Sequence, residues 1–586
     1  MKEKKQTVQY VTKAILAVMV IVSVFAGVTK IFTGFDIDEA YALAIPYRVL
    51  QGDRLFADMW EVHQTSFLLP YLFLKLFYAI GGSMDGVVLY TRVVTTVLHL
   101  VVSFVVYREL KRSLGEKQQD LAAILALIYF NFLPKWMINL DFSMQQLWFF
   151  TLFLVFFWKS IRKNNSAWLM FVAGVLLAFD VLAYPGMVFV YAAAVLWLFI
   201  RKEKRWQLIG GLTAGCAVSA LVFFVWIFTY MTPRELIEAV PKVFMDGSHQ
   251  YDMMTKLGLY ASQWLEVLIQ AAILLIPTLV VTVVGIWLYS RFNWPEKFGP
   301  LSKGLFFCIV FEGMISLFIT LAGLITTWGP FRLQVRYIIQ FVMAFVLYGQ
   351  MKKHREAGTE EAEKWQGTGM LLWFSLASFV GILIASNVGP VTSSSYLVIG
   401  NMVFCGLTVY LAKNQGKAMQ VFSYAGVIVF LCSLVMCKGF YMRNTEYVPG
   451  DISEPLQKVE EGPLAGVYVP VEDYERYTSD YQTIQQHTKE EDYVLFMGTE
   501  GLSNLYANGK IVIPTTISTP AFNEQWVDYF ETAGQEQPTI IFIAKNTIDD
   551  RDKFFVKNVF GIWIAERYDV ECMEETDSLC ILRKKR

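Results

Sequence analysis

The chain has 586 residues, of which 55% are hydrophobic, 16% aromatic and only 17% charged, and its mean hydropathy is +0.43. A soluble chain carries roughly a quarter charged residues, so a protein that is globular in water is excluded. The 50 basic and 51 acidic residues leave a net charge of -1, which removes the electrostatic case for a nucleic-acid partner. The seven cysteines lie mostly inside apolar stretches, which excludes a disulfide scaffold or a zinc cluster.

Apolar stretches of roughly 17–25 residues recur through the first three quarters of the chain. We expect about thirteen transmembrane helices, because a helix satisfies its own backbone hydrogen bonds in lipid. The first stretch is too long for a removable signal peptide, so it counts as a span. The fold class predicted for residues 1–439 is therefore an all-α polytopic membrane domain. Its spans lie near residues 11–33, 87–107, 120–136, 142–158, 167–184, 187–200, 207–230, 262–289, 305–327, 335–350, 368–387, 395–412 and 420–439.

Lysine and arginine mark alternate connections between these spans and so orient the chain. The connections near residues 108–117, 159–163, 201–205 and 352–355 are basic, as is the N-terminus, whereas the intervening ones are nearly free of basic residues. The basic set is predicted to be cytoplasmic. This makes the chain a multi-pass protein of the plasma membrane with its N-terminus inside and its C-terminal domain outside.

One apolar segment, residues 66–80, does not fit as a span. Its 15 residues reach roughly 22 Å at 1.5 Å per residue, against roughly 30 Å of hydrocarbon. Counting it as a span would also break the alternation of basic connections. We therefore expect a helix lying in the outer interface, within a long external loop over residues 34–86. A second external loop is expected over residues 231–261.

Residues 440–586 have ordinary polarity and are predicted to form an extracytoplasmic α/β domain. Cys572 and Cys580 flank Thr576 in an expected terminal hairpin, where the sequence is compatible with a cross-strand disulfide and equally with two thiols. The patterns predict strands at 493–498, 511–514 and 539–544, alternating with helices at 472–488, 523–533 and 552–566.

Three carboxylates, Asp36, Asp38 and Glu39, follow the first span directly. Asp36 as an N-cap with Glu39 three residues later is a capping-box pattern, so helix capping alone is one interpretation. Clustered acids at a membrane face repel one another unless something is bound, which favours a chemical site as the other interpretation. The same loop also carries Asp53, Asp58, Glu61 and His63.

The Asp-Glu pair after the first span, an interface helix and a second polar patch together resemble the C-type (GT-C) glycosyltransferases. The most similar pattern is that of the protein O-mannosyltransferase and lipid A aminoarabinose transferase superfamily. Those enzymes are polytopic and use a polyprenyl-phosphate sugar donor, and the Asp of the pair is their proposed catalytic base. The resemblance covers about residues 1–350 and implies a catalytic role for Asp38, with Glu39 and Asp36 beside it.

Other positions match weaker elements of that superfamily and are implied to bind substrate. Glu61, His63 and Gln64 correspond loosely to its polar-Pro-Pro element, whose prolines are absent here. Asp141 resembles its Leu-Asp before the fourth span, with helix capping as the alternative. Tyr184 stands where relatives often have a lysine.

The tenth span opens with Arg336-Tyr337, which resembles the family's Arg-Tyr, and Arg332 lies one turn earlier. Arginine near hydrocarbon is usually paired, and a lipid phosphate is a natural bidentate partner. Anchoring to ordinary head groups is the alternative. Lys135 and Arg92 are weaker candidates for the same phosphate.

The resemblance implies an integral membrane glycosyltransferase. It would transfer a sugar from a polyprenyl-phosphate donor to an external lipid, wall polymer or protein by a single inverting displacement. No cofactor is required, although a divalent metal could bridge Asp36, Asp141 and the phosphate. Two other functions stay open, a transporter or flippase of lipid-linked glycans and a non-catalytic protein with an external binding domain. Few ionisable residues lie inside the spans, which disfavours transport.

Overall fold

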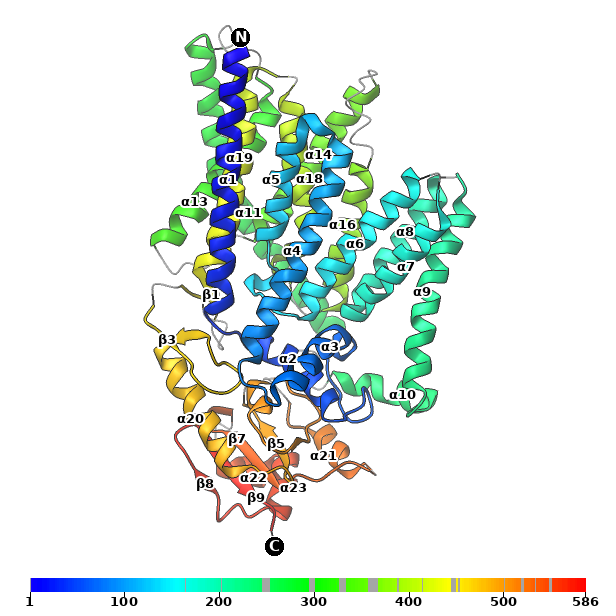
Figure 1. The fold of residues 1–586 in the computed structure, drawn as a ribbon, viewed down its shortest axis with the longest axis vertical. Helices are drawn as coiled ribbons and strands as arrows, with labels where there is room; N and C mark the ends of the chain where they lie inside the picture. Colours follow the sequence, from blue (N-terminus) through cyan, green and yellow to red (C-terminus); the bar gives the residue numbers. More distant parts are fainter. Residues whose placement is uncertain are drawn as a thin grey trace.

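The molecule consists of a helical bundle at one end and a mixed α/β domain at the other (Figure 1). The N-terminus lies at the far end of the bundle and the C-terminus lies in the α/β domain. The structure is a computed structural model, and it describes residues 2–585 apart from 164, 202, 245–252, 295–300, 326–333, 357–366, 387–388, 414, 444–448, 452–453, 500, 518–520, 533 and 548–550.

Each of the thirteen predicted spans contains a helix, which confirms the all-α membrane domain. Within the described part of the chain, nine of these helices are long and apolar enough to cross a membrane. The helices are α1 (Lys2–Phe32), α4 (Val87–Leu114), α5 (Gln119–Asn131), α6 (Phe142–Arg162), α7 (Ala167–Ala183), α8 (Val188–Arg201), α9 (Arg205–Ile227), α11 (Met253–Arg291), α13 (Lys303–Ile325), α14 (Val335–Glu356), α16 (Thr368–Ala385), α18 (Val398–Ala412) and α19 (Lys417–Phe440).

Two of the basic connections that were expected on one side do lie together. Lys159 of α6 forms an ion pair with Glu109 of α4 at 2.9 Å, and Arg162 donates to Ser113 Oγ at 3.3 Å. The connections α4–α5 and α6–α7 therefore share one end of the bundle, as the charge pattern predicts. The side of the membrane on which this end lies remains a prediction.

Glycine allows a close crossing of α7 and α9. A Cβ on Gly174 of α7 would lie 2.2 Å from the carbonyl oxygen of Leu212, and one on Gly215 of α9 would lie 2.1 Å from that of Phe171. Both distances are shorter than van der Waals contact with backbone atoms that cannot move aside. In lipid, small residues of this kind let helix backbones approach and pack.

The long loop after α1 folds into two helices between the bundle and the α/β domain (Figure 1). α2 (Ile37–Leu50) follows α1 after a short turn, and α3 (Leu68–Gly81) is the helix expected in the interface. α3 has 14 residues and reaches about 21 Å, which is too short to cross the hydrocarbon. The second loop, which was expected to be external, begins with α10 (Pro233–Ala239), and part of it lies outside the described residues.

Short 3-10 segments complete the connections among the described residues. Two of them, η1 (Gln64–Ser66) and η3 (Pro134–Trp136), carry site residues. The others in the bundle are η2 (Glu116–Gln118), η4 (Pro185–Met187), η5 (Val240–Val243) and η7 (Ser394–Leu397), with the single-turn helix α17 (Pro390–Ser393) before η7.

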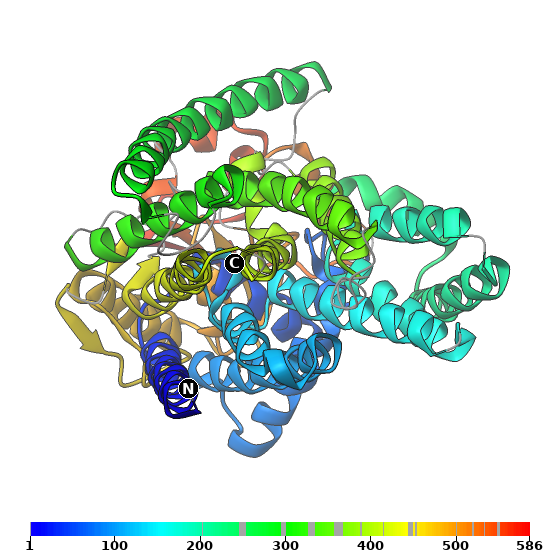
Figure 2. The same ribbon diagram turned by 90° about the horizontal axis from the view of Figure 1, so that it is seen from above.

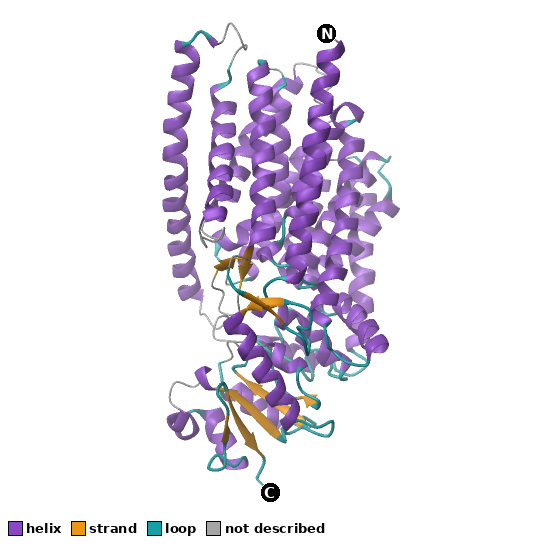
Figure 3. Ribbon diagram, turned by 60° about the vertical axis from the view of Figure 1, so that its left-hand side comes forward, coloured by secondary structure: helices purple, strands orange, loops and turns teal. Residues whose placement is uncertain are grey.

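The C-terminal region has a five-stranded sheet in the order β6-β5-β7-β9-β8 (Figure 3). The strands β6, β5 and β7 are parallel, whereas β9 is antiparallel to both β7 and β8. This confirms the predicted α/β domain. Its main elements are β5 (Tyr493–Met497), β6 (Lys510–Ile511), β7 (Ile540–Ala544), β8 (Glu574–Glu575), β9 (Leu579–Arg583), α20 (Val471–His487), α21 (Glu524–Glu531), α22 (Arg551–Lys557) and α23 (Val559–Arg567).

Smaller elements join this sheet to the bundle. Two antiparallel ribbons follow α19, β1 (Tyr441–Arg443) with β2 (Pro449–Asp451) and β3 (Leu456–Lys458) with β4 (Tyr468–Pro470). The segments η8 (Gly501–Leu505) and η9 (Lys545–Thr547) follow β5 and β7. The expected terminal hairpin is β8–β9, and Cys572 and Cys580 are both thiols there, the first exposed and the second buried.

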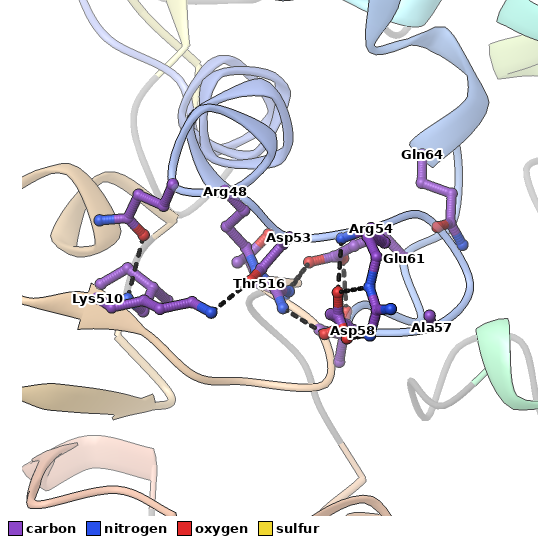
Figure 4. A network of polar contacts seen from close by, with 12 residues as sticks. Arg48, Asp53, Arg54, Ala57, Asp58, Glu61, Gln64, Lys510 and Thr516 are labelled. Atoms are coloured by element: carbon purple, nitrogen blue, oxygen red, sulfur yellow. Dashed lines mark hydrogen bonds and ion pairs between the residues drawn. The ribbon is translucent and has the colours of Figure 1, made fainter. Parts of the chain in front are cut away.

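A buried arginine organises the loop that lies between the bundle and the α/β domain. Arg48, near the end of α2, donates from Nε to Asp53 at 2.8 Å, from Nη1 to Glu61 at 3.3 Å and from Nη2 to the Asp58 carbonyl oxygen at 2.7 Å (Figure 4). Its side chain is inaccessible to solvent. Charge-assisted bonds to two carboxylates and a carbonyl satisfy the guanidinium in this buried position.

The same loop is bound to the α/β domain by hydrogen bonds. Glu61 accepts from Thr515 Oγ1 at 2.8 Å and from the Thr516 backbone N–H at 2.6 Å, while the Trp60 N–H donates to the Pro514 carbonyl oxygen at 2.7 Å. Because Glu61 also binds Arg48, α2 and the α/β domain share one polar network.

Candidate active site

The acid at the start of α2 has a structural role. Asp36 is the N-cap of α2, and its Oδ1 accepts from the Asp38 backbone N–H at 2.9 Å. The residue is buried. The capping interpretation of Asp36 is therefore confirmed, although the Glu39 side chain does not complete a capping box and turns to an arginine of α4 instead.

That arginine holds α2 against the bundle. Arg92 Nε and Nη2 lie 2.7 and 2.6 Å from the two carboxylate oxygens of Glu39, which makes a bidentate pair. Arg92 also donates to the carbonyl oxygens of Ile31 and Gly34, at 3.0 and 2.6 Å. Both charged side chains are buried. Arg92 and Glu39 together join the end of α1, the start of α2 and the first turns of α4.

Asp38 differs from its two neighbours because its carboxylate is 24% exposed and faces a cation. Lys135 Nζ lies 3.1 Å from Asp38 Oδ2 and 3.9 Å from Asp141 Oδ2. Lys135 is 20% exposed and belongs to η3, where its φ of 54° is left-handed. The short turn between α5 and α6 thus points an ammonium group at the first turn of α2.

Asp141 is the third member of this cluster. It is the N-cap of α6, and its Oδ1 accepts from the Met144 backbone N–H at 2.8 Å. Burial raises the pKa of the Asp141 carboxyl, and the nearby Lys135 ammonium opposes that rise. Helix capping, the alternative expected for Asp141, is therefore observed together with its proximity to the Asp38 site.

The second polar patch reaches the same place through an aromatic ring. Lys135 Nζ lies 4.1 Å from the centroid of the Phe142 ring, and the His63 ring stacks on Phe142 with centroids 3.6 Å apart. The ring centroid of Tyr184 lies 5.2 Å from that of His63, and the ring centroid of Tyr396 lies 6.0 Å from that of Tyr184. An aromatic wall of residues from four connections thus lies beside the Asp38–Lys135 pair.

The remaining members of that patch lie elsewhere in the loop. Glu61 is fully buried between Arg48 and the α/β domain, and Gln64 Oε1 accepts from the Phe56 backbone N–H at 2.8 Å. Both lie in the loop between α2 and α3 (Figure 4). Their hydrogen bonds are those of a structural network, so we do not include these two residues among the proposed substrate contacts.

Of the two arginines expected at the phosphate, Arg336 lies within the described residues. Arg336 is buried in the bundle, where Nη1 donates to Ser433 Oγ and Nη2 to the Tyr337 hydroxyl, both at 3.1 Å. Its guanidinium also lies 5.2 Å from the Phe430 ring centroid. The contacts of Arg336 connect α14 with α19, and the Tyr337 ring packs edge-on against Phe132 at the end of α5, with the ring centroids 6.2 Å apart. Arg332 lies outside the described residues.

The divalent metal expected to bridge Asp36, Asp141 and a phosphate stays a prediction. Asp36 caps a helix, and the Lys135 ammonium already lies between Asp38 and Asp141. The described residues also contain no group of three or more His, Cys, Asp or Glu side chains that could hold a metal ion. The positive charge of this cluster is supplied by the chain itself.

Two features of the site were underestimated from the sequence. Lys135 was a weaker candidate than Arg336 for the phosphate contact, because the sequence pattern does not predict which turn approaches α2. Phe142 and Tyr396 were missed because aromatic residues at span ends are common in any membrane protein. The pairing of Arg92 with Glu39 could have been predicted from the sequence. An arginine within a span needs a buried counter-charge, and Glu39 is an acid near the corresponding end of the preceding span.

Comparison with known proteins confirms the family resemblance. Residues 66–228 match the family described as dolichyl-phosphate-mannose-protein mannosyltransferase, a segment that runs from η1 to just beyond the end of α9. This is a family of membrane glycosyltransferases of the GT-C type that use lipid-phosphate sugar donors. No curated protein sequence matches the chain.

The chain is also similar to solved structures of an oligosaccharyltransferase from Archaeoglobus fulgidus. The complex with zinc and sulfate has 14% identity and a TM-score of 0.44, covering 94% of this chain and 71% of that one. The complex with an inhibitory peptide and a dolichol-phosphate has 12% identity and a TM-score of 0.46, covering 96% and 73%. The form tethered to an acceptor peptide has 11% identity and a TM-score of 0.48, covering 98% of this chain and 74% of that one. These values assign no residue and no substrate to this chain.

Proposed function

We propose that this chain, which carries the signature of a lipid-phosphate-dependent glycosyltransferase family over residues 66–228, transfers a sugar from a polyprenyl-phosphate to an acceptor hydroxyl with Asp38 as general base. The observation that supports this most is the difference among the three opening acids. Asp36 and Glu39 are buried in structural contacts, whereas Asp38 is partly exposed and faces Lys135.

In the proposed reaction, the Asp38 carboxylate accepts the proton of the acceptor hydroxyl. The acceptor oxygen then attacks the anomeric carbon from the side opposite the phosphate, and the bond between that carbon and the phosphate oxygen breaks. The electron pair leaves with the lipid phosphate, so the anomeric configuration inverts once. General-base assistance of this kind contributes typically 10²–10⁴-fold.

Lys135 has two proposed tasks in this reaction. Its ammonium, 3.1 Å from Asp38, favours the ionised carboxylate that a base requires. The same ammonium is partly exposed and offers positive charge to a phosphate as negative charge develops on it. The aromatic wall of His63, Phe142, Tyr184 and Tyr396 is proposed to border the sugar or the first isoprene units.

Turnover of a synthetic polyprenyl-phosphate sugar by the purified protein tests this proposal. We expect transfer or slow hydrolysis with inversion, and we expect Asp38→Asn to abolish it while leaving the melting temperature unchanged. Asp58→Asn is the matched control, because Asp58 is an acid of the same loop that pairs with Arg54 at the surface. A fully active Asp38→Asn protein would overturn the assignment.

A further inference from the structure

A cavity lies at the end of the bundle remote from Asp38. It has a volume of about 150 Å³ and is lined by α4, α5, α6, α16 and α18 among the described residues. Its walls are apolar, with Val106, Leu154, Trp158, Leu371 and Val403 among them. Figure 2 views the bundle from this end. On α6 the lining runs from Thr151 to Trp158, a depth of about 10 Å along the helix axis.

Charged side chains surround one end of this cavity. Glu109, which lines it, is bound by Lys159 at 2.9 Å and by Arg112 at 3.1 Å. Ser113, also in the lining, accepts a hydrogen bond from Arg162 at 3.3 Å. Two cations therefore bind the Glu109 carboxylate and a third, Arg162, binds the neighbouring Ser113, so these four charged side chains carry a net positive charge.

We propose that the cavity and its rim bind an anionic glycerophospholipid, with one acyl chain in the cavity and the phosphate among Lys159, Arg162 and Arg112. An apolar cavity beside cations is complementary to a molecule with a hydrocarbon chain and a phosphate, and basic residues at span ends attract anionic lipid. The depth of about 10 Å is less than half of a hydrocarbon core of about 30 Å, so the lipid belongs to one leaflet.

The first experiment measures lipid binding to the purified full chain. Protein in detergent is titrated with phosphatidylglycerol or phosphatidylcholine of the same acyl chains, and the lipid-bound fraction is counted by native mass spectrometry. We expect preferential binding of phosphatidylglycerol. Lys159→Gln and Arg162→Gln should each weaken it about tenfold, because each removes a charge-assisted contact. Lys163→Gln, a neighbouring cation outside these contacts, should leave binding unchanged.

A second variant has the opposite expected sign. Glu109→Gln removes the carboxylate that holds Lys159 and Arg112, so both cations become available to the lipid phosphate and phosphatidylglycerol binding should tighten. A purely structural role for these ion pairs predicts no such gain. Inorganic phosphate, tested by its effect on the melting temperature, distinguishes a free-anion site from a lipid site.

Three results would overturn the proposal. They are equal binding of both lipids, unchanged phosphatidylglycerol binding in the Lys159→Gln/Arg162→Gln double variant, and a melting-temperature rise with inorganic phosphate as large as that with phosphatidylglycerol. A cavity-filling variant, Leu154→Trp, should reduce phosphatidylglycerol binding while leaving the rim charges in place, and normal binding by this folded variant would count against the acyl chain in the cavity.

Discussion

Three neighbouring carboxylates at the start of α2 have three different environments. Asp36 binds the backbone, Glu39 binds a buried arginine, and Asp38 faces a partly exposed lysine. Only an acid that solvent and substrate can reach is able to exchange a proton with an acceptor. Residue type alone does not distinguish these roles, because the distinction lies in partners that come from α4 and from the turn before α6.

Lys135 is expected to affect the chemistry more than the fold. Lys135→Met removes the ammonium beside Asp38 and should lower kcat/KM by about a hundredfold or more, the usual cost of losing one electrostatic contact to the transition state. Lys135→Arg keeps the charge and should retain more activity. Initial rates with a synthetic donor measure both, and wild-type kcat/KM in Lys135→Met would contradict the role.

The Glu39–Arg92 pair is expected to affect stability first. Replacing Arg92 by Leu leaves Glu39 as a buried unpaired charge and should destabilise the protein by about 3–5 kcal/mol. The double variant Glu39→Leu/Arg92→Leu removes both charges and should be less destabilised than Arg92→Leu. Thermal unfolding in detergent measures the difference. A double variant no more stable than Arg92→Leu would show that the pair is not what holds α2.

Much of the residue-level site could be predicted from the chain near Asp38, and little of it from elsewhere. The N-cap position of Asp36 depends on local residues, so the sequence was sufficient to predict it, whereas Glu39 binds Arg92 instead of completing the expected capping box. The approach of Lys135 depends on the left-handed turn in η3 and on how α5 and α6 pack, both of which are set by long-range contacts. Arg336 was expected at the phosphate because of its position on α14, yet its side chain points into the bundle.

At the scale of elements, the helices of the bundle follow the apolar stretches closely. Hydropathy and length predict a span well because lipid leaves the backbone no alternative. The crossings between spans are harder to predict from the sequence, since they depend on which small residues of two helices face each other. Strand order in the α/β domain was also not predictable, because parallel strands separated by helices can be arranged in several orders.

The crossing of α7 and α9 provides a test at this scale. Gly174→Ala or Gly215→Ala would place a Cβ about 2 Å from a carbonyl oxygen of the other helix, so we expect either change to separate the helices and lower the melting temperature. Gly210→Ala on α9 is the control, because nothing lies within 4 Å of its Cβ. Equal melting temperatures for Gly174→Ala and Gly210→Ala would contradict close packing at this crossing.

At the scale of the whole molecule, the α/β domain is attached to the bundle through the loop after α1. The loop meets the domain through Glu61 and through backbone contacts at Trp60 and Pro514. Composition and polarity predicted the domain but not this attachment, because no local pattern marks a pair of residues more than 450 positions apart.

Arg48 is expected to maintain this attachment. Arg48→Met leaves the buried carboxylate of Glu61 without its cation and leaves Asp53 with the Lys510 ammonium at 3.5 Å, so the melting temperature should fall and the domain should become more sensitive to limited proteolysis. Arg54→Gln is the control, because the Arg54 side chain is 50% exposed. Within the described part of the chain, Arg54 forms an ion pair with Asp58 alone. A surface pair of this kind contributes about 0–1 kcal/mol. Equal proteolysis rates for the two variants would contradict the expectation.

Helix α2 is fixed near both of its ends to different bodies. Glu39 fastens its first turn to the bundle, and Arg48, nine residues later, fastens its last turn to the domain network. Across about 14 Å, α2, which contains Pro46, therefore joins the bundle contact of Glu39 to the domain contact of Arg48, and Asp38 lies next to the first of these contacts. We therefore expect a displacement of the α/β domain to be transmitted along α2 and to change the distance between the Asp38 carboxylate and the Lys135 ammonium.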